Sequence, residues 1–282
     1  MRTFALTNSR RRFVCLALSL LGCVILTVNV LGRCLSGSEN ATSSASGIEL
    51  KPLRVLFVGN SYTYVNMLPE MIRQLSLAAK EGRPTEYRMI APGGYSLEQH
   101  WNDGTVTKAI AEGGWDYVVL QEQSLRPISD PANMHRFARL FDDEARKIGA
   151  KTVFYVTWAR KTAPDQQKQL TRAYSAIAKE LGGLCCPVGP AWADVLKGRP
   201  DVELYQSDGS HPSPAGSYIG ACVFYAMLYG KSPVGLPGKV IARDDAARAI
   251  TLVDLREADA RLFQQTAAET VKEWKGGVTP AP

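Results

Sequence analysis

The sequence predicts a three-layer α/β fold, with a mostly parallel five-stranded sheet between two layers of helices. Short apolar runs rich in Val, Ile, Phe and Tyr alternate with amphipathic stretches from Leu53 onward. This alternation is typical of parallel strands joined by helices that cover both faces of the sheet. The chain has 282 residues, of which 45% are apolar, and is therefore long enough for one large globular domain.

The expected elements follow one another in a regular order. The segments expected to be buried strands are 53–58, 87–91, 117–120, 152–158 and 184–188. The segments with helical spacing are 68–80, 132–148, 166–181, 212–229 and 244–274. Mixed charges over 243–273 predict that the last helix is solvated on one face and covers an edge of the sheet.

The first 50 residues differ in composition from the rest of the chain. Arg10, Arg11 and Arg12 precede the uncharged stretch 13–32, a pattern typical of signal peptides and signal anchors. Its length, about 20 residues, is just enough to span a bilayer, and lipid attachment at Cys23 is a third option. We therefore expect 1–33 to be a signal peptide or anchor and the protein to be extracytoplasmic, whether secreted, periplasmic or membrane-anchored.

The Ser-rich stretch 34–50 is expected to be a flexible linker to a folded domain at 51–282. The net charge of +6 belongs mainly to the leader, because residues 1–47 hold five arginines and one glutamate. The remaining 28 basic and 26 acidic residues leave a net of +2, which argues against nucleic-acid binding.

Three of the six cysteines lie beyond the leader and its linker: Cys185, Cys186 and Cys222. An odd number that includes an adjacent pair argues against a disulfide framework, and no pair has metal-ligand spacing with a histidine. We expect these cysteines to be buried as small apolar side chains, and no metal site is predicted.

Two polar segments far apart in the sequence carry the residues best suited to chemistry. Ser61 lies in the loop after the first strand, where its hydroxyl would face the crevice at the carboxyl ends of the strands. Backbone N–H groups at the following helix start could stabilise an oxyanion, although a serine there is also a common helix cap. Near the other end, Asp208 can orient the imidazole of His211 as a general base. A structural Asp–His pair that caps the following helix is the alternative.

Together the two segments resemble the SGNH (GDSL-like) hydrolases over about residues 53–230. The family's first block matches Gly59-Asn60-Ser61-Tyr62, with Asn60 in place of Asp, and its last block, Asp-x-x-His, matches 208–211. The resemblance implies a flavodoxin-like topology for a catalytic domain at 51–282. It also implies acyl transfer without a cofactor, with Ser61 as nucleophile, His211 as base and Asp208 as the orienting carboxylate.

The two middle blocks of the family match less closely. The second corresponds to Gly94-Tyr95-Ser96, and the third falls on 121–124, where Gln123 takes the place of the family's Asn. The resemblance implies an oxyanion hole formed by the N–H groups of Ser61 and Gly94 and the amide of Gln123. A Gln amide donates the same hydrogen bond as Asn from one methylene further away.

Several neighbouring side chains could line the substrate site: Asn60, Tyr62, Trp101 and Glu122. Trp101 could instead pack on the sheet. Trp158 and Arg160 follow the fourth strand at the same edge and could touch substrate, although a tryptophan there is more often part of the core.

The expected function is that of a serine esterase that hydrolyses carboxylic esters through an acyl-enzyme intermediate. The resemblance implies short acyl groups on carbohydrate, or another small ester, as the substrate. Two alternatives remain open: a lipase or acyltransferase that uses the same residues, and a non-catalytic surface protein that binds glycans.

Overall fold

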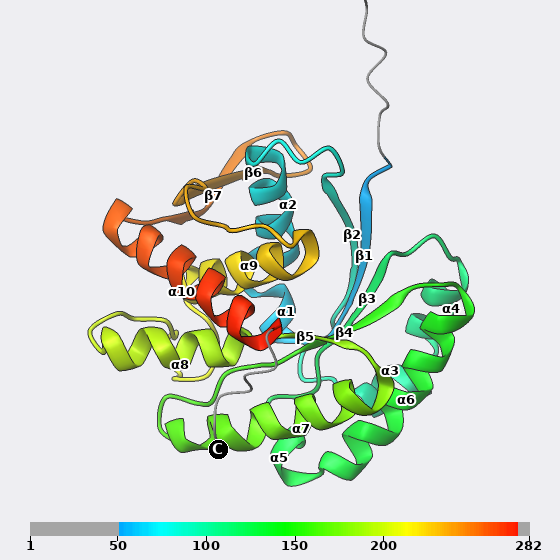
Figure 1. Cartoon of the computed structure of the whole chain (residues 1–282). Helices are drawn as coiled ribbons and strands as arrows, with labels where there is room; N and C mark the ends of the chain where they lie inside the picture. Colours follow the sequence, from blue (N-terminus) through cyan, green and yellow to red (C-terminus); the bar gives the residue numbers. More distant parts are fainter. Residues whose placement is uncertain (1–50, 276–282) are drawn as a thin grey trace, which may run out of the picture. The chain divides into compact units, whose positions relative to one another are not determined.

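The computed structural model describes residues 51–275, and a five-stranded parallel sheet is their central element (Figure 1). The strands are β1 (Leu53–Val58), β2 (Thr85–Ile90), β3 (Tyr117–Leu120), β4 (Lys151–Tyr155) and β5 (Leu184–Cys186). Their order is β2-β1-β3-β4-β5, and every neighbouring pair is parallel.

Helices cover both faces of this sheet (Figure 1). One face carries α2 (Leu68–Ala78), α8 (Val188–Gly198), α9 (Pro214–Tyr229) and α10 (Glu257–Lys275). The other carries α3 (Leu97–Asp103), α4 (Thr105–Ala111), α6 (Pro131–Lys147) and α7 (Gln167–Leu181). Alternate residues of β1 supply the two cores, with Phe57 in the first and Leu56 in the second, because successive strand side chains point to opposite faces. The predicted three-layer α/β fold is confirmed.

The order of the strands determines where a ligand can bind. From β1 the chain moves outward to β2 and then crosses to β3 on the other side of β1. Loops that leave β1 and β3 therefore diverge, and ligands of such sheets bind between these loops at the carboxyl ends of the strands. The loop after β1 leads into α1 (Ser61–Tyr64) and η1 (Val65–Met67), and the loop after β3 leads into α5 (Arg126–Ser129).

The expected single helix over 244–274 is wrong in its first part. Lys239–Arg243 (β6) and Ala249–Asp254 (β7) pair as an antiparallel hairpin, and α10 begins only at Glu257. The Asp244 carboxylate closes the turn by accepting the N–H of Arg248 at 2.8 Å. Buried Leu252 and Val253 join the core beneath α2 and α9, so tertiary packing overrides the helix-like distribution of charge.

Two expected strands are shorter in the structure. The apolar runs 152–158 and 184–188 predict longer strands, but β4 ends at Tyr155 and β5 at Cys186, where α8 follows almost at once. Segment 156–158 is buried without being part of the strand, because it turns into the loops around the candidate site. Another short element, η2 (Pro164–Gln166), lies between this segment and α7.

The three predicted buried cysteines are free thiols in the core. Our predictions for 1–33, Cys23 and 34–50 concern residues outside the part of the chain that the structure describes. Between residues 51 and 275, no helix has the length and apolar character needed to span a membrane.

Candidate active site

Ser61 is the first residue of α1, directly beyond the carboxyl end of β1. Asn60 caps this helix, since its Oδ1 accepts the N–H of Tyr62 at 3.2 Å. The Asn60 amide also donates to the Tyr95 carbonyl at 2.9 Å. A Cβ on Gly59 would lie 2.3 Å from the Thr63 hydroxyl, so the strand can turn this closely only at a glycine. The local sequence thereby fixes the backbone on which Ser61 is carried.

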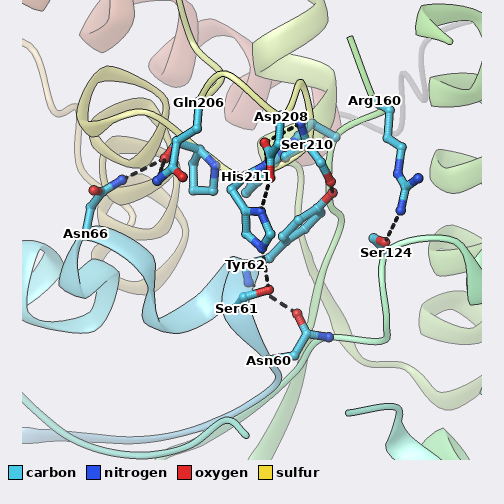
Figure 2. Close-up of polar contacts among 12 residues, drawn as sticks. Asn60, Ser61, Tyr62, Asn66, Ser124, Arg160, Gln206, Asp208, Ser210 and His211 are labelled. Atoms are coloured by element: carbon cyan, nitrogen blue, oxygen red, sulfur yellow. Dashed lines mark hydrogen bonds and ion pairs between the residues drawn. The ribbon is translucent and has the colours of Figure 1, made fainter. Parts of the chain in front are cut away.

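His211 lies 150 positions from Ser61 in the sequence, yet its Nε2 is 2.8 Å from the Ser61 Oγ (Figure 2). The other ring nitrogen, Nδ1, is hydrogen-bonded to Oδ2 of Asp208. Because a carboxylate accepts only, Nδ1 carries the proton and Nε2 is left to accept one from the serine. The structure therefore brings the three predicted residues together as a hydrogen-bonded Ser-His-Asp triad.

Asp208 is held in place by its own backbone. Its Oδ1 accepts the N–H groups of Ser210 and His211, each at 2.9 Å. The hydrogen bond from His211, followed by these two backbone bonds, lowers the pKa of Asp208 to about 2. The carboxylate is thus ionised at neutral pH, as required of a group that stabilises an imidazolium.

An aromatic stack supports the segment that carries His211. Tyr62 stacks on Trp158 with ring centroids 4.6 Å apart, and Trp158 stacks on Trp192 at 4.2 Å. The Tyr62 hydroxyl lies 2.6 Å from Ser210 Oγ, and Trp158 Nε1 donates to the Ser210 carbonyl at 2.9 Å. Tyr62, predicted as part of a substrate wall, is only 3% exposed and contacts His211 edge-on. Its position suits it to support the imidazole from behind.

The two further predicted oxyanion donors lie on loops at this edge. Gly94 precedes α3 with φ of +74°, a conformation that favours glycine. Gln123 follows β3 and is partly exposed. Its Nε2 donates to Ser124 Oγ at 3.3 Å, and its Oε1 accepts the N–H of Leu125 at 2.9 Å. The amide is therefore held within its own loop by one long and one ordinary hydrogen bond.

Gln121 has a larger part in the site than the sequence indicated. It is fully buried, and its Oε1 accepts both the Asn60 N–H and the Thr63 hydroxyl, each at 2.9 Å. The sequence placed it only within 121–124, the segment that falls on the family's third block. The available clue was topological, because the last residues of β1 and β3, Val58 and Leu120, pair in parallel and the residues that follow them therefore lie close together.

Glu122, predicted as part of the substrate wall, is 1% exposed and lies beneath the surface. One of its oxygens, Oε1, accepts the N–H of Gln123 at 2.6 Å and the N–H of Leu97 at 3.2 Å. It therefore links the loop after β3 to the start of α3. Burial raises the pKa of this carboxyl to about 7, against the opposing effect of those hydrogen bonds.

Trp101 and the remaining histidines have packing roles in the structure. Trp101 packs edge-on against Phe141 with ring centroids 5.2 Å apart, on the core side of α3. His100 is buried, its Nε2 is 2.7 Å from the Gly59 carbonyl oxygen, and desolvation lowers its pKa. His135 Nε2 lies 2.8 Å from the Ala173 carbonyl oxygen on the far helical layer. Across residues 51–275, no cluster of three acidic, His or Cys side chains is arranged to hold a metal ion.

Comparison with known proteins identifies the class. No family model matches the sequence, and no curated protein matches it. A protein from Slackia heliotrinireducens assigned as an SGNH hydrolase is 31% identical, over 63% of this chain and 99% of its own, with a TM-score of 0.55. The chain belongs to the SGNH hydrolase family, and the predicted membership is confirmed.

Other solved structures share the fold at lower identity. A DUF4886 family protein from Bacteroides uniformis is 20% identical, over 79% of this chain and 95% of its own, with a TM-score of 0.60. A variant of an acetyl xylan esterase from Geobacillus stearothermophilus is 16% identical, over 64% of this chain and 97% of its own, with a TM-score of 0.51. At such identities the likeness extends to the fold alone.

Proposed function

We propose that the protein is a serine esterase that removes short acyl groups from carbohydrates through an acyl-enzyme on Ser61. The 2.8 Å separation between His211 Nε2 and Ser61 Oγ carries this proposal. A hydroxyl within hydrogen-bonding reach of a base, itself oriented by a carboxylate, is the arrangement that nucleophilic catalysis requires.

In the first step, Ser61 Oγ attacks the ester carbonyl carbon while His211 Nε2 takes the hydroxyl proton. Asp208 stabilises the imidazolium that forms. The tetrahedral intermediate then collapses, and His211 donates the proton to the oxygen of the departing alcohol. The acyl group is left as an ester on Ser61.

In the second step, water takes the place of the alcohol. His211 removes a proton from the water as its oxygen attacks the acyl carbon, and the collapse of this second intermediate returns a proton to Ser61 Oγ. The N–H groups of Ser61 and Gly94 would bind the oxyanion in both steps. The Gln123 amide would join them by exchanging its 3.3 Å bond to Ser124 for one to the oxyanion.

The side chains around the serine favour a hydroxyl-rich alcohol over a lipid chain. Asn60, predicted as part of the substrate wall, is only 2% exposed and cannot contact substrate, but the partly exposed side chains on the surrounding loops include the polar residues Gln123, Ser124, Arg160 and Ser210. The His211 side chain is 34% exposed and that of Asp208 is 45% exposed, so the reacting groups are open to a bulky substrate. An acetyl xylan esterase with the same fold acts on an acylated polysaccharide, which agrees with this substrate class.

The test is hydrolysis of p-nitrophenyl acetate by the purified protein and by Ser61→Ala, with Ser129→Ala as the control because Ser129 is exposed on α5. We expect the activity of Ser61→Ala to fall by about 10³-fold or more. A fluorophosphonate, which labels reactive serines, should modify the unmodified protein but not this variant. Equal activity in the two variants would contradict the assignment of the nucleophile. Preference for acetyl over octanoyl esters would support the carbohydrate esterase over the lipase.

We further propose that residues 1–33 export the protein, on the strength of the sequence pattern alone. Cell fractionation of the full chain tests this. Recovery of all the protein in the cytosol would contradict it.

A further inference from the structure

Arg160 lies in the segment between β4 and α7, beside the segment that carries His211. Three hydrogen bonds join the two segments, from Trp158 Nε1 to the Ser210 carbonyl (2.9 Å), from the Lys161 N–H to Gly209 (2.9 Å), and from the Tyr205 hydroxyl to Ala159 (2.8 Å). These bonds fix the backbone on both sides of Arg160. The arginine is therefore anchored at the same edge of the sheet as the candidate catalytic triad.

The side chain of Arg160 extends from there toward the loop after β3. Its Nη2 is 3.5 Å from Ser124 Oγ, and Figure 2 shows the guanidinium directed at this hydroxyl. Ser124 follows Gln123, the predicted oxyanion donor, and the same loop begins at Gln121, which holds Asn60. The Arg160 side chain thus reaches from the segment beside the His211 loop to the loop that fixes the residue before Ser61.

The charge of Arg160 is not neutralised by the protein. A guanidinium offers five N–H donors, yet the Ser124 contact is the one side-chain hydrogen bond that Arg160 makes to the described residues. Its Nε is buried without a partner, and no carboxylate of residues 51–275 lies within 4.0 Å of the group.

Neighbouring cations at this edge are paired. Arg126 binds Glu98 at 3.0 Å, and Lys161 binds Glu203 at 2.6 Å. These partners are therefore committed elsewhere and cannot serve Arg160. A cation with free donors at the same edge of the sheet as the candidate catalytic residues is suited to bind an anion of the substrate, because planar guanidinium groups pair with carboxylates through two parallel hydrogen bonds.

We propose that Arg160 binds a carboxylate of the substrate and makes the enzyme selective for acidic esters. This inference rests on the proposed esterase function and narrows its substrate class. The carboxylate could belong to the alcohol half, as in an acylated uronic acid, or to the acyl half, as in a half-ester of a dicarboxylic acid. A neutral hydroxyl group of the substrate at the same position would leave the positive charge of Arg160 unpaired.

The experiment compares two pairs of esters that differ in one carboxylate. For the acyl half the pair is p-nitrophenyl succinate against p-nitrophenyl acetate, and for the alcohol half it is 3-acetoxybenzoate against phenyl acetate. We expect the full-length protein to favour the acid in one of the two pairs. Arg160→Gln should lower kcat/KM for that acid by about 10- to 100-fold, mainly through KM, because a charge-assisted hydrogen bond is lost. The matched neutral ester should change by about 3-fold or less.

Lys161→Gln is the matched control. It removes the same charge from the adjacent position, but the Lys161 ammonium is already paired with Glu203. We expect it to preserve the selectivity that Arg160→Gln abolishes. Arg160→Lys should keep part of the selectivity, because a lysine retains the charge without the planar fork.

Three outcomes would overturn the proposal. Equal losses on acidic and neutral esters in Arg160→Gln would show that the residue only supports the fold. Hydrolysis of neutral esters with no preference for either acid would refute the selectivity while leaving the esterase intact. No hydrolysis of any ester by the unmodified protein would contradict the esterase proposal itself, and this inference with it.

Discussion

The side-chain amide of Gln121 makes hydrogen bonds to both the backbone and the side chain of Asn60. Its Oε1 accepts the Asn60 N–H at 2.9 Å, and its Nε2 donates to Asn60 Oδ1 at 3.0 Å. Asn60 in turn caps the helix that starts with Ser61. The first residue after β3 therefore fixes the backbone immediately before the proposed nucleophile.

Replacement of Gln121 by Met should weaken both the fold and the site. Met has a similar length but accepts no strong hydrogen bond, so the buried Asn60 N–H would lose its partner at a cost of about 1–3 kcal/mol. We expect a lower midpoint in urea unfolding and a fall in kcat of about 10-fold or more. Gln265→Met, at an exposed position on α10, is the control. Unchanged unfolding in Gln121→Met would show that water replaces the amide.

Replacement of Asp208 by Asn should lower kcat by about 10³- to 10⁴-fold, with little change in KM. The Asn oxygen can still accept the N–H groups of Ser210 and His211, so the turn is kept. A neutral amide, however, cannot stabilise the imidazolium and can present a donor to Nδ1. Steady-state kinetics on p-nitrophenyl acetate measure the effect. Asp201→Asn is the control, since Asp201 is exposed and paired with Arg199. A loss below about 10-fold would argue that Asp208 only shapes the loop.

Replacement of Gln123 by Ala should lower kcat by roughly 10²-fold and leave KM nearly unchanged, if its amide stabilises the oxyanion. Gln123→Asn restores the residue type of the family's third block and should retain more activity than Ala. Rates for the two variants on the same ester decide the point. Equal rates for Ala and the unmodified enzyme would remove Gln123 from the oxyanion hole.

Glu122 should make the stability of the fold depend on pH. Its pKa is raised from 4.5 to about 7 by burial, while the charge of Arg126 lowers it and that of Glu98 raises it. The folded state therefore binds the proton more tightly than the unfolded state. The stability due to the neutral carboxyl is fully present below pH 4.5 and is lost as pH rises through about 7.

Glu122→Gln should remove this dependence, because its amide oxygen can still accept the N–H groups of Leu97 and Gln123 but does not titrate. Between pH 4.5 and pH 8, the unmodified protein should lose on the order of 3 kcal/mol more unfolding free energy than the variant. Urea unfolding of both proteins at the two pH values gives the difference. Parallel pH profiles would mean that the carboxyl keeps an ordinary pKa in the fold.

The pattern of apolar and polar residues correctly predicted those strands whose burial it reflects directly. Leu53–Val58 and Tyr117–Leu120 have the predicted bounds, because both are short runs of mainly apolar residues, broken only by Arg54, and most of their side chains are buried. Helical spacing over 244–274 and the mixed charges over 243–273 predict one helix there, yet Ala249–Asp254 is a strand. Its pairing with β6 depends on hydrogen bonds to another strand, and a pattern of charges carries no information about that partner.

The fold class, the family and the local contact between Asp208 and His211 follow from the amino-acid sequence alone, because periodicity and a three-residue spacing act over short distances. The 2.8 Å contact between Ser61 Oγ and His211 Nε2, in contrast, depends on how the distant segments fold together. The burial of Glu122, the packing of Trp101 against the core and the lack of a carboxylate partner for Arg160 are likewise seen only in the folded chain. Burial and charge pairing depend on atoms supplied by remote segments, and the position of a side chain in the sequence does not specify those atoms.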